Sequence, residues 1–166
     1  LLQLQKENKN NPSGCFFPQN CTTYAEAEEF LKNYIKNQYA FYGYGIYGIF
    51  NKENENFLGI AGFSPFENII TSDTVNSKEK NFEISEKHPE KTSENNLNEY
   101  SAEIGYSILK QWQQQGFASE VLPPLLHFGK EYLGFTEIVT RIEKSNIASI
   151  RLAKKNHLKI LICEAK

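Results

Sequence analysis

Hydrophobic residues recur at helical spacing in the segment AEAEEFLKNYIKNQ, which follows two threonines in the first quarter of the chain. The recurring positions are Ala25, Phe30, Leu31, Tyr34 and Ile35. Thr23 and Glu26 have the spacing of a capping box, in which each side chain bonds to the backbone of the other residue. The pattern predicts a helix from about Tyr24 to Gln38.

Two runs of aromatic and β-branched residues follow, FYGYGIYGIF at 41–50 and FLGIAGF at 57–63, with the polar segment NKENEN between them. Runs of this kind bounded by Asn-rich turns are typical of the two strands of a hairpin. The first run carries aromatic side chains that either pack within the sheet, the favoured interpretation, or line a binding surface: Phe41, Tyr42, Tyr44 and Tyr47.

The second half of the chain alternates strand and helix patterns. A strand is predicted over 100–109, where Ala102, Ile104, Tyr106 and Ile108 share one face. The remaining predictions are a helix that opens at Gly116 and stops near Gly134, a strand over 137–143, a helix over 146–156 and a strand over 158–163. Strand–helix–strand units form right-handed crossovers, so at least one strand pair is parallel. We therefore predict a mixed α/β fold, one sheet flanked by helices.

The segment 67–99 differs from the rest of the chain in composition. It contains eight acidic residues and four lysines, a net charge of −4, so the remaining residues carry +2 of the chain's total of −2. A connection of this length is either functional or mobile, and the polar composition favours a mobile insertion between two strands. Its short apolar groups at 69–71 and 82–84 leave a small extra strand as the alternative.

Length and composition exclude several classes of protein. A chain of 166 residues suits one domain, so residues 1–166 are predicted to form a single domain. A hydrophobic content of 40% excludes wholesale disorder, and 23% charged residues, with no apolar run near the roughly 20 residues of a membrane span, exclude an ordinary membrane protein. The net charge of −2 argues against direct nucleic-acid binding.

The cysteines indicate no metal site. Cys15, Cys21 and Cys163 are odd in number, and their spacing matches neither a zinc site nor a CxxC redox motif. We expect reduced thiols in a cytoplasmic protein without a bound metal.

Candidate chemistry concentrates in IGYSILKQWQQQGFASE, residues 104–120. A strand ends near Leu109, a Gln-rich turn follows, and Gly116 opens a helix. Backbone N–H groups at a helix start have no partner within the helix, and the helix dipole adds partial positive charge there. Such a turn can hold a phosphate with backbone groups alone, and Gly116 permits the close approach of a ligand.

The turn resembles the acetyl-CoA-binding motif of the GNAT superfamily of N-acetyltransferases, Gln/Arg-x-x-Gly-x-Gly/Ala, which reads Gln113-Gln114-Gln115-Gly116-Phe117-Ala118 here. The segments AEIGYSIL, QGFASE and NIASIRLAKKNHL, with YAEAEEFL near the start, are similar to the branch that contains the ribosomal-protein alanine N-acetyltransferases. The resemblance implies a GNAT-like, mostly antiparallel sheet with one splayed parallel pair. It covers residues from about Thr22 to Cys163, apart from the acidic insertion.

The resemblance implies an acetyl-CoA site. The pyrophosphate would lie on the backbone amides of the turn that Gln113 begins, which are those of Gln115, Gly116, Phe117, Ala118 and Ser119. The pantetheine arm would pair with the strand backbone near Ile108, and Asn146 would hold the same arm. The implied reaction is direct acetyl transfer from a thioester to a primary amine.

Two catalytic residues are proposed from the needs of this reaction. The amine must lose a proton, and Glu103, on the strand that leads to the turn, is the candidate base. The alternative interpretation of Glu103 is a solvated residue on the outward face of the strand. Ser149 is the candidate proton donor to the departing thiolate, since Ala153 stands where many relatives have a tyrosine; its alternative is a helix-surface hydroxyl.

The acceptor stays open between a protein N-terminus, such as that of a ribosomal protein, and a small amine such as a polyamine or an amino sugar. We expect a monomer or a homodimer. Ala153, and His157 and Leu158 in place of the usual Gly-Phe pair, favour a second hypothesis, a non-catalytic acyl-CoA-binding or regulatory module.

Overall fold

The computed structural model describes residues 3–4, 7, 21–66 and 100–163. The predicted insertion at 67–99 lies outside the described residues, so the predicted single domain and the two alternatives for that segment stay predictions.

The described strands form one five-stranded sheet in the order in which they occur along the chain. They are β1 (Ile46–Phe50), β2 (Phe57–Pro65), β3 (Ser101–Ile108), β4 (Glu137–Glu143) and β5 (Lys159–Cys163). β1, β2 and β3 pair antiparallel, whereas β3 with β4 and β4 with β5 pair parallel. The predicted mixed sheet is confirmed, and its antiparallel share is smaller than expected because β4 and β5 are also parallel.

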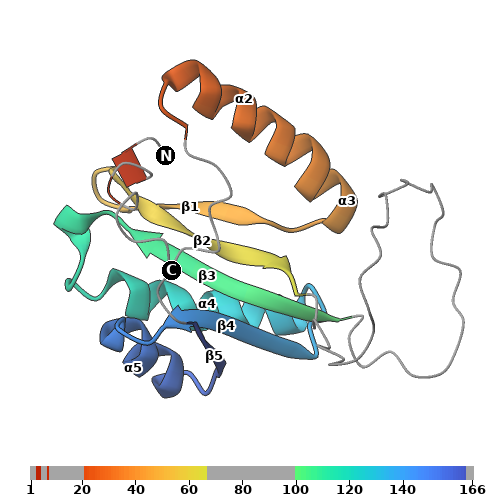
Figure 1. Ribbon diagram of the computed structural model, residues 1–166, viewed down its shortest axis with the longest axis vertical. Coiled ribbons are helices and arrows are strands. Elements are labelled where there is room, and N and C mark those ends of the chain that lie inside the picture. Colours follow the sequence, from red (N-terminus) through yellow and green to blue (C-terminus); the bar gives the residue numbers. More distant parts are fainter. Residues whose placement is uncertain (1–2, 5–6, 8–20, 67–99, 164–166) are drawn as a thin grey trace, which may run out of the picture.

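Helices lie beside the middle of this sheet and beside both of its outer strands. The helical elements are α2 (Tyr24–Tyr34), the π-helical turn η1 (Ile35–Tyr39), α3 (Ala40–Tyr42), the 3₁₀ turn η2 (Lys110–Trp112), α4 (Phe117–Glu131) and α5 (Ile147–Lys155). α2 lies beside β1, α4 runs behind the middle of the sheet, and α5 lies next to β4 and β5 (Figure 1). The layers confirm the predicted α/β arrangement.

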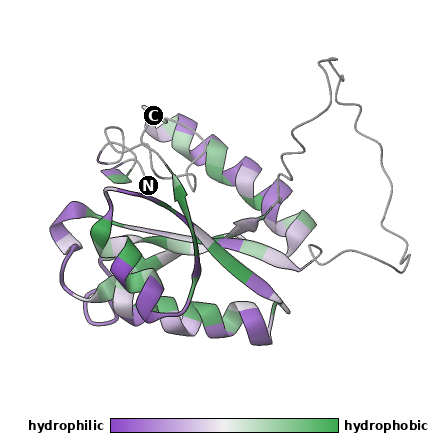
Figure 2. Ribbon diagram, turned by 60° about the horizontal axis from the view of Figure 1, so that its bottom comes forward, coloured by the Kyte–Doolittle hydropathy of each residue, from purple (hydrophilic) through white to green (hydrophobic). Residues whose placement is uncertain are grey.

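The main hydrophobic core lies between the middle strands and α4. It contains Phe63, Ala102, Ile104, Leu122, Leu126, Phe135 and Ile138. Phe63 is fully buried and Ile104 is 1% exposed, and burying one side chain of this kind stabilises a fold by about 1.5–3 kcal/mol. Hydrophobic and hydrophilic residues alternate along the long helices, as expected where one helix face is buried (Figure 2). This core fixes β3, which carries part of the site described below.

The capping box predicted at the first helix is present. Thr23 Oγ1 accepts a hydrogen bond from the N–H of Glu26 at 3.2 Å, and Glu26 Oε2 accepts from the N–H of Thr23 at 3.2 Å. The carboxylate of Glu26 also accepts from the N–H of Thr22, and these hydrogen bonds lower the pKa of Glu26.

The predicted strand over 41–50 is wrong in its first half, because helical structure continues to Tyr42 and β1 begins only at Ile46. Gly43, with φ of 73°, ends the helix in the left-handed conformation. Two helical tyrosines then bond the free edge of the strand: Tyr39 donates to the carbonyl of Ile46 at 2.5 Å, and the Tyr34 hydroxyl accepts from the N–H of the same residue at 3.1 Å. Burial raises the pKa of both phenols to about 12, so both stay protonated at neutral pH.

Candidate functional site

The site begins where two parallel strands separate. β3 and β4 are paired only from Ser101 to Glu103 on one strand and from Glu137 to Val139 on the other. Beyond this point β3 continues to Ile108 and β4 to Glu143 without pairing to each other. The backbone groups on the facing edges are therefore available to a ligand, and a cavity of about 560 Å³ opens between the strands. This volume is in the range of small-molecule sites.

The Gln-rich turn closes one end of this cleft. Gln114 and Gly116 both have positive φ, 60° and 93°, and Gly116 is the N-cap of α4 without any side-chain cap bond. The first helical hydrogen bond joins the N–H of Glu120 to the carbonyl of Gly116 at 3.0 Å, so the preceding N–H groups have no acceptor in the helix. A Cβ atom added to Gly116 would meet nothing within 4 Å. The turn thus presents backbone donors to open space.

The two glutamine side chains predicted at the turn bond within the turn itself. Gln113 Nε2 donates to the carbonyl of Ile108 at 2.9 Å, and Gln115 Nε2 donates to the carbonyl of Gln111 at the same distance. Gln113 therefore ties the turn to the last residue of β3. It holds the shape of the site, and the backbone groups remain free for a ligand.

Trp112, the single tryptophan of the sequence, lies in the 3₁₀ turn just before the Gln-rich turn. It packs against the two hydrophobic clusters that contain Ile108 and Leu109, and its ring meets that of Phe117 edge-on with centroids 6.3 Å apart. The indole N–H is buried and has no hydrogen-bond partner among the described residues. Trp112 thus acts mainly through packing, which holds the start of α4 against β3.

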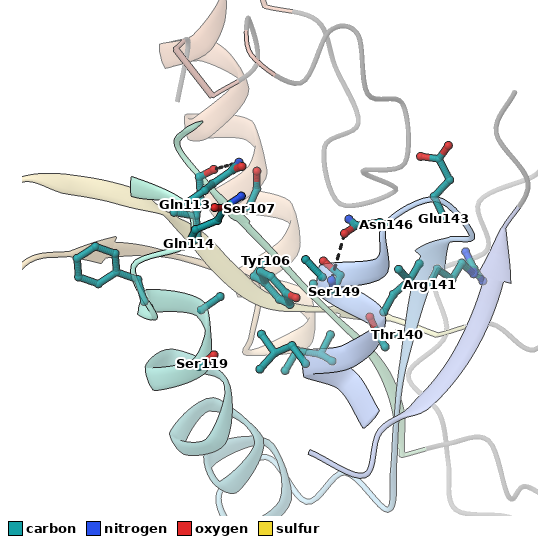
Figure 3. Close-up of a pocket in the computed structure, with 18 of the residues that line it drawn as sticks. Tyr106, Ser107, Gln113, Gln114, Ser119, Thr140, Arg141, Glu143, Asn146 and Ser149 are labelled. Carbon is teal, nitrogen blue, oxygen red and sulfur yellow. Dashed lines mark hydrogen bonds between the residues drawn. The ribbon is translucent and has the colours of Figure 1, made fainter. Parts of the chain in front are cut away.

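α5 forms the opposite wall of the cleft. Asn146 is its N-cap, and Asn146 Oδ1 accepts a hydrogen bond from the N–H of Ser149 at 3.1 Å. This cap fixes the first turn of the helix, and Asn146 and Ser149 both line the cleft (Figure 3). Opposite them, Tyr106 on β3 also lines the cleft, with its side chain on the side of Ser149 (Figure 3). Burial raises the pKa of Tyr106, so its phenol is neutral at physiological pH.

Glu103 lies at the point where the strands separate and is only 6% exposed. The solvated position considered for it is therefore wrong. Its carboxylate is 3.4 Å from Nη1 of Arg141 on β4. Burial raises the pKa of the Glu103 carboxyl, and Arg141 partly opposes that rise. A carboxyl with a raised pKa holds a proton at a higher pH than an ordinary glutamate does, which suits a general base.

Glu103 and Tyr106 project from opposite faces of β3, since successive side chains of a strand alternate. Ala102 and Ile104 pack against α4, and Tyr106 packs against the same core. Glu103 points to the other face, where the Arg141 guanidinium also lies 5.6 Å from the ring centroid of Phe66. The cleft thus has a carboxyl on one face of the sheet and two hydroxyl groups on the other.

A sequence model of the acetyltransferase (GNAT) domain matches residues 7–159. The chain belongs to this acetyltransferase family. As a GNAT enzyme it is an acetyltransferase, and the separated strands and the Gly116 turn are the parts of its fold that the resemblance assigned to the donor substrate.

Solved structures show the same fold at low sequence identity. An N-acetyltransferase from Staphylococcus aureus Mu50 is 20% identical, with a TM-score of 0.61 over 94% of this chain and 73% of that one. A ribosomal-protein-alanine N-acetyltransferase from Brucella melitensis is 14% identical, with a TM-score of 0.60 over 93% and 74%. A Salmonella typhimurium protein solved with its cofactor acetyl-CoA is 17% identical, with a TM-score of 0.60 over 93% and 68%.

The structure brings the sequence-predicted residues of the acetyltransferase to one cleft. Those that line it are Glu103, Ile108, Gln113, Gly116, Phe117, Ala118, Ser119, Asn146 and Ser149. Gln115 lies in the same turn. The roles predicted for these residues stay predictions.

Sequence reasoning missed several residues that line the cleft, and Tyr106 and Arg141 are two of them. The alternation of β3 placed Tyr106 on the buried face, and the signal that could have revealed it is a hydroxyl among Ala102, Ile104 and Ile108. Arg141 had no signal of its own, because its partner is set by the pairing of two strands that lie far apart in the sequence.

Within the described part of the chain, no group of three or more metal-ligating side chains is present. In the same residues, no helix combines the length and apolar character that crossing a bilayer requires.

Proposed function

We propose that this acetyltransferase transfers the acetyl group of acetyl-CoA directly to a primary amine. The observation that carries the proposal is the separation of β3 and β4 beside the Gly116 turn. The cleft offers the edge of β3 beyond Glu103, which does not pair with β4, and beside the end of that strand it offers the N–H groups at the start of α4. These suit the amide groups of a pantetheine arm and a pyrophosphate, respectively.

The donor would thread between the two walls of the cleft. Its pyrophosphate would lie on the backbone amides from Gln115 to Ser119, where a Cβ on Gly116 would project into open space. The pantetheine arm would run along β3 past Ile108, with Asn146 on the facing helix. The turn binds charge with N–H groups and the helix dipole, so a chain with net charge −2 can hold an anionic ligand.

Glu103 is proposed as the base. It accepts a proton from the amine as the nitrogen lone pair attacks the thioester carbonyl carbon. When the intermediate collapses, the carbon–sulfur bond breaks and its electron pair leaves on sulfur, which gives an amide and a thiolate. Ser149, on the other face of the sheet, donates a hydrogen bond to the departing sulfur, which then takes its proton from water. Base and donor approach the reacting carbon from opposite sides.

The acceptor is proposed to be a protein N-terminus, with a small amine as the second choice. The name of the Brucella melitensis relative, a ribosomal-protein-alanine N-acetyltransferase, supports the first choice. One observation supports the alternative, a non-catalytic acyl-CoA-binding module: Ala153 is buried and offers no hydroxyl to the cleft.

One assay separates these possibilities. Purified protein is incubated with acetyl-CoA and a panel of peptides with different first residues, polyamines and amino sugars, and thiol release is measured. Release that depends on one class of amine supports the enzyme and identifies its acceptor. Thermal stabilisation by acetyl-CoA without thiol release across the panel would favour the module. Absence of both would overturn the proposed donor site.

A further inference from the structure

Two residues near the start of the chain, Leu4 and Glu7, lie against the elements that carry the Gln-rich turn. Leu4 is 1% exposed and shares a hydrophobic cluster with Ile60 and Leu109. Trp112, the last residue of η2, packs against the same cluster. In Figure 1 the red N-terminal residues lie at the end of the sheet where β3 leads into the turn. Leu4 therefore belongs to the hydrophobic packing that supports η2.

Glu7 bonds to the backbone at the start of η2. Glu7 Oε2 accepts a hydrogen bond from the N–H of Lys110 at 2.7 Å, and the two residues are 103 positions apart. Gln3 Nε2 donates to the other carboxylate oxygen, Glu7 Oε1, at 3.2 Å. The first N–H groups of a helical turn have no acceptor within it, and Leu109, the N-cap of η2, makes no side-chain cap bond. Glu7 thus supplies the cap that η2 lacks.

The Gln-rich turn is attached to η2 at two points. Gln115 Nε2 donates to the carbonyl of Gln111, in the middle of η2, at 2.9 Å. The backbone N–H of Gln113 donates to the carbonyl of Lys110, the first residue of η2, at 3.3 Å. Because both ends of the glutamine run are bonded to η2, the position of η2 determines the position of the backbone amides that follow.

We propose that Leu4 and Glu7 are positioning residues of the donor site, which hold η2 and thereby keep the Gln-rich turn in the shape that binds acetyl-CoA. The inference rests on the proposed function, because the ligand is the donor. Neither residue is among the described residues that line the cleft, so both act through the turn. The apparent affinity of a site falls with the fraction of molecules in which it has its binding shape. Loss of either contact should therefore weaken donor binding and leave the rate at saturating donor unchanged.

The Glu7 contact gives a prediction whose sign separates it from simple electrostatics. Glu7→Ala removes the acceptor of the Lys110 N–H, and the KM for acetyl-CoA should rise by about two- to tenfold, the effect of one hydrogen bond, at unchanged kcat. Loss of a carboxylate beside an anion-binding turn would by charge alone lower this KM. Glu7→Gln loses the same charge but keeps an acceptor oxygen, so it should restore most of the wild-type KM.

A matched control separates this role from loss of stability. Glu26→Ala also removes a carboxylate that accepts a hydrogen bond from a backbone N–H at 2.7 Å, that of Thr22 at the start of α2. It should lower the melting temperature at least as much as Glu7→Ala and leave the KM for acetyl-CoA unchanged. Leu4→Ala should raise the KM as Glu7→Ala does, and the Glu7 variants keep the test valid if its cavity unfolds the protein. A wild-type KM in Glu7→Ala, or an equal rise in Glu26→Ala, would overturn the proposal.

Amide hydrogen exchange without any ligand distinguishes failure of this inference from failure of the proposed function. The amides of Lys110, Trp112 and Gln113 are hydrogen-bonded in the wild type. They should exchange faster in Glu7→Ala and at the wild-type rate in Glu26→Ala. If acetyl-CoA did not bind to the wild type but exchange still responded to Glu7→Ala, the proposed function would be overturned and the support of the turn by Glu7 retained. Equal exchange of these amides in wild type and Glu7→Ala would overturn the inference.

Discussion

Arg141 Nη1 lies 3.4 Å from Glu103 Oε2, across the position at which β3 and β4 stop pairing. Two influences on the Glu103 carboxyl therefore oppose each other, because burial favours its neutral form and the guanidinium favours its ionised form. Burial is the larger influence, so the pKa is raised. The Glu103 side chain is 8% exposed and that of Arg141 is 33% exposed, so the pair is only partly screened by solvent.

Removing the charge of Arg141 should move the pH dependence of catalysis. Arg141→Gln removes a positive charge that lowers the pKa of Glu103, so this pKa rises further. A base must be ionised to act, and the acidic limb of kcat/KM against pH should therefore shift to higher pH. Arg141→Lys keeps the charge and should shift the limb less. The profiles are measured with one acceptor amine, so its own ionisation is common to all variants, and an unmoved limb in Arg141→Gln would exclude Glu103 as the group that this limb reports.

Replacing Glu103 itself should slow the reaction without loss of donor binding. Glu103→Gln keeps the size of the side chain but cannot take a proton, and kcat should fall by about 10²–10⁴-fold, the usual contribution of general base catalysis. The loss should shrink at high pH, where the free amine needs no base. Thermal stabilisation by acetyl-CoA should persist, and Glu131→Gln, at the exposed end of α4, should behave as wild type. A rate close to wild type at neutral pH would assign proton removal to water.

The raised pKa of Glu103 also has a consequence for stability. The folded protein holds this proton more tightly than the unfolded chain does. The stability that Glu103 contributes is therefore complete below the ordinary glutamate pKa of 4.5 and is lost as the pH rises through the higher pKa of the folded state. Glu103→Gln has no such proton. The melting temperature of the variant should therefore fall less than that of wild type over this pH range, and parallel curves for the two proteins would contradict the assigned shift.

Local patterns were sufficient for most of the fold. The strand predicted over 137–143 is β4 with the same bounds, and the helix predicted over 146–156 contains α5 with Asn146 as its cap. These elements follow from periodicity and capping, which neighbouring residues determine. The strand prediction was wrong over 41–45 for a different reason. Its aromatic residues suit a strand as well as a helix, and the choice depends on the bonds of Tyr34 and Tyr39 to Ile46, which only the folded chain brings together.

The same distinction applies to the site. The Gly116 turn could be predicted because its motif and its helix start are contiguous in the sequence. The contact of Glu103 with Arg141 and the meeting of Tyr106 and Ser149 in one cleft could not, because each joins residues about forty positions apart. These contacts depend on where two parallel strands separate, and periodicity carries no information on that position.

Gln113 should affect donor binding through the shape of the turn. Gln113→Ala removes the hydrogen bond from Nε2 to the carbonyl of Ile108, which joins the turn to the end of β3. The loss of one such bond, worth about 0.5–1.5 kcal/mol, should raise the KM for acetyl-CoA by up to about tenfold. The kcat at saturating donor should stay close to that of wild type, because the acetyl group reacts at the other end of the cleft. Gln111→Ala, with an exposed side chain in the preceding turn, is the control, and equal KM values for the two variants would contradict this role.

Gly116 and Gly134 provide the sharpest comparison for the donor site. Both have positive φ, 93° and 74°, and a Cβ on either would meet nothing within 4 Å. A non-glycine residue in this conformation costs about 1–2 kcal/mol, so Gly116→Glu and Gly134→Glu should lose similar stability. Gly116 lines the cleft, and there the new carboxylate would occupy the space proposed for the pyrophosphate and repel it. Acetyl-CoA should raise the melting temperature of Gly134→Glu as it does that of wild type, and it should have no effect on Gly116→Glu. If acetyl-CoA stabilised both variants equally, the donor phosphates would have to bind away from this turn.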